Sequence, residues 1–157
     1  RQVALKVKVL NALYSTRILA VNVVADHIAG LTEIDSLLSA GSAEAVDLIA
    51  NVQIKARRFC FYSFASKYCN WHNPSAYPIY DRNVDAYLWF NRAQVPMPFL
   101  RQDLWDYREF VRVVTAFRRF SGLDSVGFKD LDKFLFSEGD KLMPKLRLEA
   151  EHEAAAG

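Results

Sequence analysis

The chain has few of the residues that make up common nucleotide-binding and catalytic motifs. Its six glycines are scattered singly among 157 residues, so there is no glycine-rich loop to hold the phosphates of a nucleotide. The GxSxG segment typical of serine hydrolases is also absent. These absences leave little room for a kinase, a dehydrogenase or a serine hydrolase.

Cysteine is scarce as well, with only Cys60 and Cys69, which lie nine residues apart in one stretch expected to be helical. Nine residues of helix separate two Cα atoms by about 13 Å, which is too far for a disulfide bond. We therefore expect two reduced thiols and a cytoplasmic protein. Cys69 and His72 have the spacing of metal ligands, but a closed zinc site needs four ligands and no second pair exists. We predict no metal and no other cofactor.

Long apolar runs are missing, although apolar residues are abundant. No window reaches the roughly 18 to 20 uncharged apolar residues of a membrane span, and the first residues, RQVALKVK, do not resemble a signal peptide. We therefore expect no membrane partner. Apolar residues make up 52% of the chain and include eleven Phe, seven Tyr and three Trp, which is enough to build a core.

Apolar side chains recur at helical spacing along most of the chain, separated by prolines and small polar residues. This pattern predicts an all-α fold, an irregular bundle of about seven to eight short helices. We expect one domain over residues 1–146 and a flexible C-terminal tail over 147–157. The expected helices lie at about 2–14, 17–30, 32–38, 43–52, 53–73, 82–91, 103–120 and 128–138, the last one ending at Gly139.

Basic residues are concentrated in the middle of the chain. The net charge is −1 over residues 1–52, +6 over 53–119 and −3 over 120–157. A positive centre suits DNA or another polyanion, although a solvated basic face gives the same pattern.

Three of these cations, Lys55, Arg57 and Arg58, lie in the first part of the expected aromatic helix. If the helix begins at this point, its free N–H groups and the three side chains together favour a phosphate. If the helix begins earlier, the same residues lie mid-helix and face water. Both interpretations stay open at the level of sequence.

Asp81 follows a proline-bounded turn, NPSAYPIYD, and stands where the helix 82–91 begins. The simplest interpretation is an N-cap, whose carboxylate accepts hydrogen bonds from the first free N–H groups. Such bonds also hold an aspartate ionised, so one side chain can cap a helix and act in catalysis.

The short helices, the segment SFASKYCNWHNP and the following YPIYDRNV together resemble the helix-hairpin-helix DNA glycosylase superfamily. That family carries its catalytic aspartate in a Pro-hydrophobic-x-Asp-x-x-Val segment, and residues 78–84, PIYDRNV, match each position. The resemblance implies double-stranded DNA as the partner. It also implies that Asp81 is the carboxylate that helps to hydrolyse the N-glycosidic bond of a damaged or modified base.

The chain departs from the family at three points. The Gly-hydrophobic-Gly of the hairpin and the four-cysteine iron–sulfur loop are missing, and Ser63 stands where the bifunctional enzymes carry their catalytic lysine. Lys67, one helical turn later, is the second catalytic candidate, and the resemblance implies a monofunctional glycosylase. The DNA contacts that it implies are Lys55, Arg57, Arg58, Ser63, Arg82 and Asn83. The aromatic candidates for a pocket that takes a flipped base are Tyr62, Trp71, Tyr80 and Trp89.

The alternative is a helical protein-interaction or DNA-binding module without catalysis. In that case the aromatic residues form the core and a binding groove, and Asp81 only caps its helix. This alternative predicts that the protein releases no base.

Overall fold

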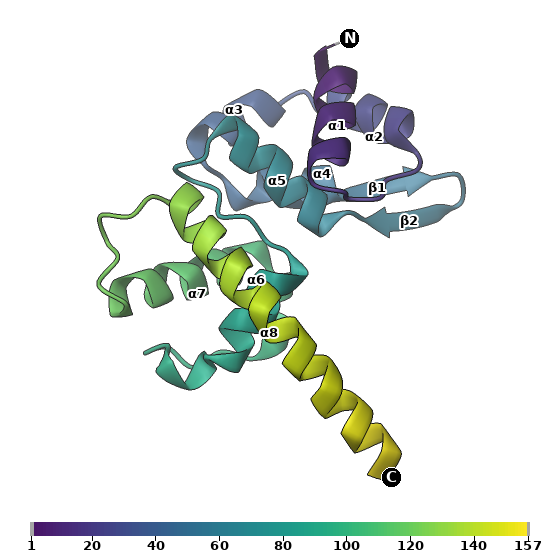
Figure 1. The fold of residues 1–157 in the computed structure, drawn as a ribbon. Helices are drawn as coiled ribbons and strands as arrows, with labels where there is room; N and C mark the ends of the chain where they lie inside the picture. The colour runs from purple at the N-terminus through teal and green to yellow at the C-terminus, as the bar shows by residue number, and fades with distance from the viewer. Residues whose placement is uncertain (1, 157) are drawn as a thin grey trace. The chain divides into compact units, whose positions relative to one another are not determined.

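The protein is described by a computed structural model, which covers residues 2–156 and the side chains of residues 2–148. The chain divides into two compact units, Arg1–Ile79 and Tyr80–Gly157. The described residues form eight α-helices, two short 3-10 helices and one two-stranded sheet (Figure 1). The predicted all-α irregular bundle is therefore confirmed, whereas the single domain over residues 1–146 stays a prediction.

The first unit holds five helices, and α1 packs against α2 while α5 packs against α4. Their bounds are α1 Gln2–Leu13, α2 Val21–Ala29, α3 Ile34–Ala40, α4 Ala43–Ala50 and α5 Tyr62–His72. Each helix contributes buried apolar side chains to the core, among them Val7, Leu10, Val24, Ile28, Leu38, Ile49 and Phe64. Because these residues recur at spacings of three and four, one face of each helix is apolar and packs inward.

Tyr77 ties the segment after α5 to the connection between α3 and α4. Its side chain is fully buried, and its hydroxyl hydrogen-bonds with the carbonyl oxygens of Leu37 and Ser42 at 2.9 and 3.0 Å. The side-chain amide of Asn70 on α5 donates to the carbonyl oxygen of Tyr77 at 2.7 Å. Asn73 and Pro74 end α5. The hydrogen bonds of Tyr77 then hold the non-helical segment that follows against the first unit.

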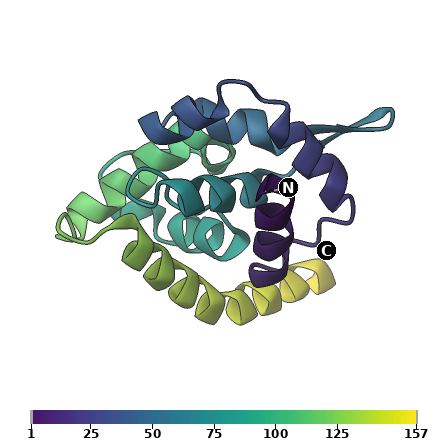
Figure 2. The same cartoon turned by 90° about the horizontal axis from the view of Figure 1, so that it is seen from above.

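Residues 51–60 form a β-hairpin, so both helical interpretations of this basic segment were wrong. Strands β1 (Asn51–Ile54) and β2 (Arg57–Cys60) are antiparallel and joined by a two-residue turn at Lys55 and Ala56. Val52 on β1 is fully buried and β1 contacts α2 and α4, which anchors the hairpin to the helices. In Figures 1 and 2 the turn of the hairpin projects away from the helices of its own unit.

The second unit consists of three α-helices and two 3-10 helices. Their bounds are α6 Arg82–Phe90, η1 Arg92–Gln94, η2 Arg101–Trp105, α7 Tyr107–Phe120 and α8 Phe128–Ala156. Tyr87 of α6 makes edge-to-face ring contacts with Phe117 of α7 and Phe134 of α8, at centroid distances of 6.0 and 5.9 Å. This aromatic cluster joins the three helices of the unit.

Helix α8 begins at Phe128 as predicted but does not end at Gly139, so the predicted end of this helix was wrong. The helix continues to Ala156 and contains Pro144. A Cβ atom at position 139 would lie 2.5 Å from the carbonyl carbon of Asn83, so the glycine allows α8 to approach the first turn of α6 closely. Residues 147–156 of the predicted tail belong to α8, and the flexibility of the tail stays a prediction.

None of the helices in the described part of the chain is both long and apolar enough to cross a bilayer.

Candidate functional site

Asp81 caps α6 with one of its two carboxylate oxygens. Its backbone is extended, with φ −152° and ψ 175°, and Oδ1 accepts hydrogen bonds from the backbone N–H groups of Asn83 and Val84 at 2.9 and 3.0 Å. The side chain is half-buried, and no described group bonds Oδ2. One oxygen thus orients the carboxylate at the positive end of the helix, and the cap does not use the other.

The residues that follow Asp81 have different surroundings. Arg82 is exposed, as a residue that contacts a phosphate must be. The side-chain amide of Asn83 donates to Asp140 Oδ1 on α8 at 3.3 Å, so it already has a partner within its unit.

Tyr80, a predicted base-pocket residue, belongs to a packed polar network. Its hydroxyl donates to Asp85 Oδ2 at 3.1 Å, and Arg101 donates through two nitrogens to Asp85 Oδ1 at 2.8 and 3.1 Å. The Tyr80 ring also contacts Phe110 edge to face, at 5.4 Å between centroids. Burial and the neighbouring Asp85 carboxylate raise the pKa of Tyr80, so its hydroxyl stays neutral at physiological pH.

The other predicted pocket residue of this unit, Trp89, is half-buried beside different neighbours. The guanidinium of Arg92 lies 4.3 Å from the centre of the Trp89 ring, and Phe99 contacts the ring edge to face at 6.2 Å. These contacts are those of a packed surface tryptophan with a cation over its ring.

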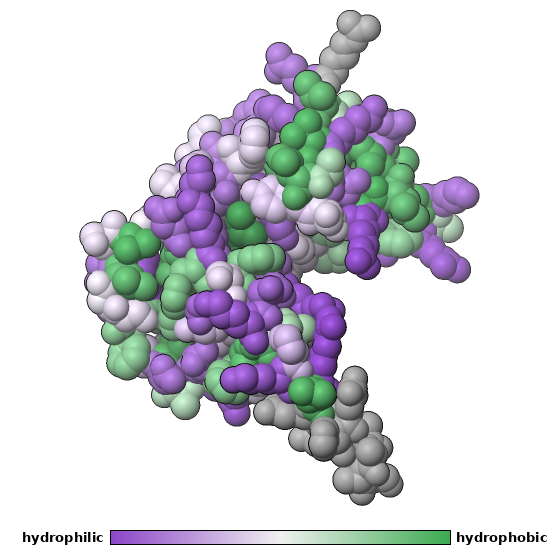
Figure 3. All heavy atoms as spheres, viewed as in Figure 1, coloured by the Kyte–Doolittle hydropathy of each residue, from purple (hydrophilic) through white to green (hydrophobic). Residues whose placement is uncertain are grey.

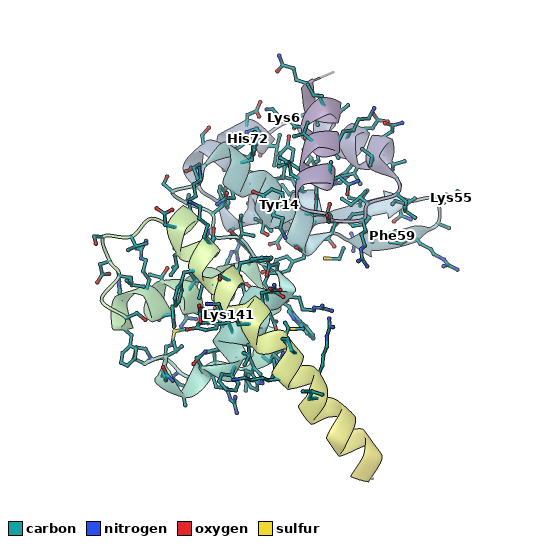
Figure 4. All side chains as sticks on the ribbon, in the orientation of Figure 1. Lys6, Tyr14, Lys55, Phe59, His72 and Lys141 are labelled. Carbon is teal, nitrogen blue, oxygen red and sulfur yellow. The ribbon has the colours of Figure 1, made fainter. Side chains whose placement is uncertain are left out.

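In the first unit, helix α5 brings two of the predicted residues together. Lys67 Nζ donates to Ser63 Oγ at 2.6 Å, as expected for side chains four residues apart on one helix face. Only 6% of Lys67 is exposed. Its ammonium lies 5.6 Å from the centre of the ring of Tyr14, a residue labelled in Figure 4. A buried lysine is rare unless it has polar partners or a function. Sequence spacing does not predict the contact of Lys67 with Tyr14, because Tyr14 follows the end of α1, far from Lys67 in the sequence.

The remaining aromatic candidates of α5 do not form one enclosed pocket. Trp71 is 53% exposed, whereas Tyr62 is half-buried at the first turn of the helix.

The predicted DNA-contacting cations Lys55, Arg57 and Arg58 all lie on the β-hairpin, and all three are exposed. Lys55 occupies the first position of the turn with φ 54°. Tight hairpin turns require this left-handed backbone conformation, which residues other than glycine rarely adopt. The hairpin therefore presents three positive charges to solvent.

The described side chains contain no group of three or more His, Cys, Asp or Glu residues arranged to hold a metal ion.

Comparison with known proteins places the chain in a family. The HI_0787_N family model, which describes an N-terminal domain, matches residues 1–76. An uncharacterized protein of Haemophilus influenzae is 40% identical over 140 residues, which are 88% of this chain and 67% of that protein. The chain belongs to the family of this Haemophilus protein. No solved structure matches it significantly.

The extent of these matches bears on the candidate residues. The family model ends at residue 76, close to the end of the first structural unit at Ile79, so it includes the hairpin and Lys67 but not Asp81. The alignment with the Haemophilus protein covers 88% of the chain and therefore includes its middle, where Asp81 lies. Family membership alone assigns no activity to these residues.

Proposed function

We propose that this protein binds double-stranded DNA and hydrolyses the N-glycosidic bond of a damaged or modified base, as a monofunctional DNA glycosylase. The observation that carries the proposal is the position and orientation of the Asp81 carboxylate. Asp81 lies in a PIYDRNV segment that resembles the catalytic segment of the helix-hairpin-helix glycosylases, and its carboxylate is oriented by two N–H groups through Oδ1 alone.

The proposed chemistry uses the second oxygen of Asp81. As the bond between C1′ of the deoxyribose and the base nitrogen breaks, the electron pair leaves with the base and positive charge develops on the sugar. A carboxylate near C1′ stabilises this charge electrostatically. A water molecule then adds to C1′, and the proton that it loses neutralises the departed base.

Lys67 and the basic side chains have separate parts in this proposal. Lys67, with its buried ammonium on Ser63, is the second catalytic candidate. The exposed cations Lys55, Arg57, Arg58 and Arg82 supply contacts with phosphates. The proposed location is the cytoplasm, because Cys60 and Cys69 are both free thiols.

The test is a base-release assay with the full chain on duplexes that carry a panel of damaged or modified bases. Asp81→Asn keeps a residue that caps helices as well as aspartate but removes the charge. We expect it to abolish base release and to leave duplex binding unchanged. Asp106→Asn is the matched control, because Asp106 caps α7 with the same two-bond geometry. The Asp106→Asn variant should release base like the wild type.

Two results would contradict the proposal. One is a wild-type chain that releases no base from any duplex of the panel, and the other is base release that persists in Asp81→Asn. If the protein also binds no DNA at low salt, the alternative is a non-catalytic helical interaction module. Exposed apolar side chains of the second unit, Phe90, Leu100, Trp105 and Phe120, are the observation that favours that module.

A further inference from the structure

A cation and an aromatic ring lie on one face of strand β2, and a second aromatic ring follows directly after the strand. Arg57, Phe59 and Phe61 follow one another at intervals of two residues, which places their side chains on the same face of the hairpin. The backbone N–H of Phe61 donates to the carbonyl oxygen of Ala50 at 2.8 Å and continues the strand pairing. The Phe59 and Phe61 rings lie parallel, with centroids 6.0 Å apart and an interplanar angle of 6°.

This face of the hairpin is covered at β1 and open to solvent at β2. Val52, which pairs with Phe59 across the hairpin, is fully buried and anchors the base of the hairpin to its unit. All four residues of β2 are exposed, and 40% of Phe59 is accessible to solvent. Lys55 and Phe59 are both labelled on the projecting hairpin in Figure 4.

The charge around this pair of rings has one sign. Residues 48–80 contain no Asp or Glu. No described carboxylate forms an ion pair with Lys55, Arg57 or Arg58. Hydrophilic side chains lie at the projecting end of the hairpin in Figure 3, the end that holds Lys55 in Figure 4. A partner that satisfies this surface must carry negative charge and flat apolar faces.

We propose that the hairpin of residues 51–60 binds single-stranded DNA, with an unpaired base stacked on Phe59 and the neighbouring phosphates held by Lys55, Arg57 and Arg58. An aromatic ring stacks on the face of a base, and a duplex hides these faces between neighbouring base pairs. Unpaired bases expose them, together with a negative backbone. The choice of DNA over RNA rests on the proposed function, whereas the stacking itself does not depend on Asp81.

The test uses the full chain and a fluorescein-labelled single-stranded 15-mer containing one 2-aminopurine, followed by fluorescence anisotropy and by 2-aminopurine quenching. Phe59→Ala should weaken binding about tenfold, because one base–aromatic stack contributes this much, and should remove part of the quenching. Phe59→Tyr keeps the ring and should bind like the wild type. Phe120→Ala removes a ring of similar exposure, 59%, from α7 and should also leave binding unchanged.

The charged part of the surface is tested by salt dependence. The triple variant Lys55→Gln, Arg57→Gln, Arg58→Gln should reduce the slope of log affinity against log salt by about 2, since each phosphate contact on a single strand contributes about 0.7. Lys129→Gln, Lys133→Gln, Lys141→Gln removes the same charge from exposed positions of α8 and should change the slope much less.

The outcomes separate this inference from the proposed function. Unchanged affinity in both Phe59→Ala and the hairpin triple variant would overturn the hairpin surface, even if base release still depends on Asp81. Tighter binding to the RNA 15-mer of the same sequence would overturn the assignment to DNA. Single-strand binding that needs Phe59 in a protein that releases no base would support the hairpin surface and contradict only the glycosylase.

Discussion

Replacing Gly139 by alanine tests how closely α8 approaches the first turn of α6. Gly139 is buried inside α8, and a Cβ atom there would lie 2.5 Å from the carbonyl carbon of Asn83 and 3.0 Å from its Cα. Ordinary contacts of a Cβ begin at 3.4 Å, and the atoms in the way belong to the backbone, which cannot rotate aside as a side chain does. The two helices must therefore separate.

Two opposing effects decide the sign of the change. Alanine stabilises the interior of an exposed helix by about 1 kcal/mol relative to glycine. Forcing a methyl group into a packed interface typically costs about 1–3 kcal/mol, and more when only the backbone can give way. Because the clash at Gly139 is with backbone, we expect the second effect to dominate and the free energy of unfolding to fall by about 2 kcal/mol.

The measurement is unfolding by heat and by urea, followed by circular dichroism. A loss of about 2 kcal/mol lowers Tm by about 4–8 °C for a chain of this size. Gly30→Ala is the matched control, because a Cβ at Gly30 meets its nearest atoms at 3.5 Å, and its free energy of unfolding should change by less than about 1 kcal/mol. A Gly139→Ala variant as stable as the wild type would refute the close approach of α8 to Asn83.

The same substitution also bears on Asp81. Asn83 supplies one of the two N–H groups that orient Asp81, and its side chain bonds Asp140 on α8. A shift of α8 away from Asn83 therefore disturbs the first turn of α6, which holds the carboxylate. If Asp81 is catalytic, Gly139→Ala should reduce base release by more than its loss of folded protein at the assay temperature explains.

Three further predictions follow from individual side chains. Cys60 is exposed and Cys69 is buried, and burial strongly raises the pKa of the Cys69 thiol. Iodoacetamide should therefore label one thiol in the native chain and two in urea. Rapid labelling of both thiols in the native chain would contradict this prediction. Burial and the nearby Lys6 ammonium lower the pKa of His72 below 6.5. As pH falls, His72 is therefore protonated in the unfolded state before it is protonated in the folded state. The free energy of unfolding should decrease as pH falls below about 6.5. His72→Gln should weaken this pH dependence of stability, as measured by urea unfolding. An unchanged pH dependence in His72→Gln would contradict the role of His72. Asp81→Ala should lower the free energy of unfolding by about 1 kcal/mol while Asp81→Asn should not, and equal stabilities would mean that the cap contributes little.

Local sequence signals were enough to predict most of the helical framework. Asn73 and Pro74 end α5, which the chemistry of proline requires regardless of the rest of the fold. Asp81 begins α6, because an aspartate at this position satisfies N–H groups within the next three residues. The contact between Ser63 and Lys67 is likewise local, since it joins residues four apart on one helix.

The hairpin shows where local signals were insufficient. Each strand has only four residues, and a basic segment of that length between two helices is compatible with the start of the second helix. The strand conformation depends on Val52, which is buried because β1 contacts α2 and α4. Residues distant in the sequence therefore decided the placement of Lys55, Arg57 and Arg58.

By itself, the sequence determined the helical class, the C-terminal end of α5 and the start of α6, because periodicity, proline and a capping carboxylate act over a few residues. Only the tertiary structure decided that Gly139 lies within a helix, since its role is the approach of another backbone and not the end of its own. It also decided that Tyr80 bonds Asp85 within a packed network. A side chain's partners across a fold depend on how helices pack, and helical spacing predicts which face is buried without predicting what lies opposite it.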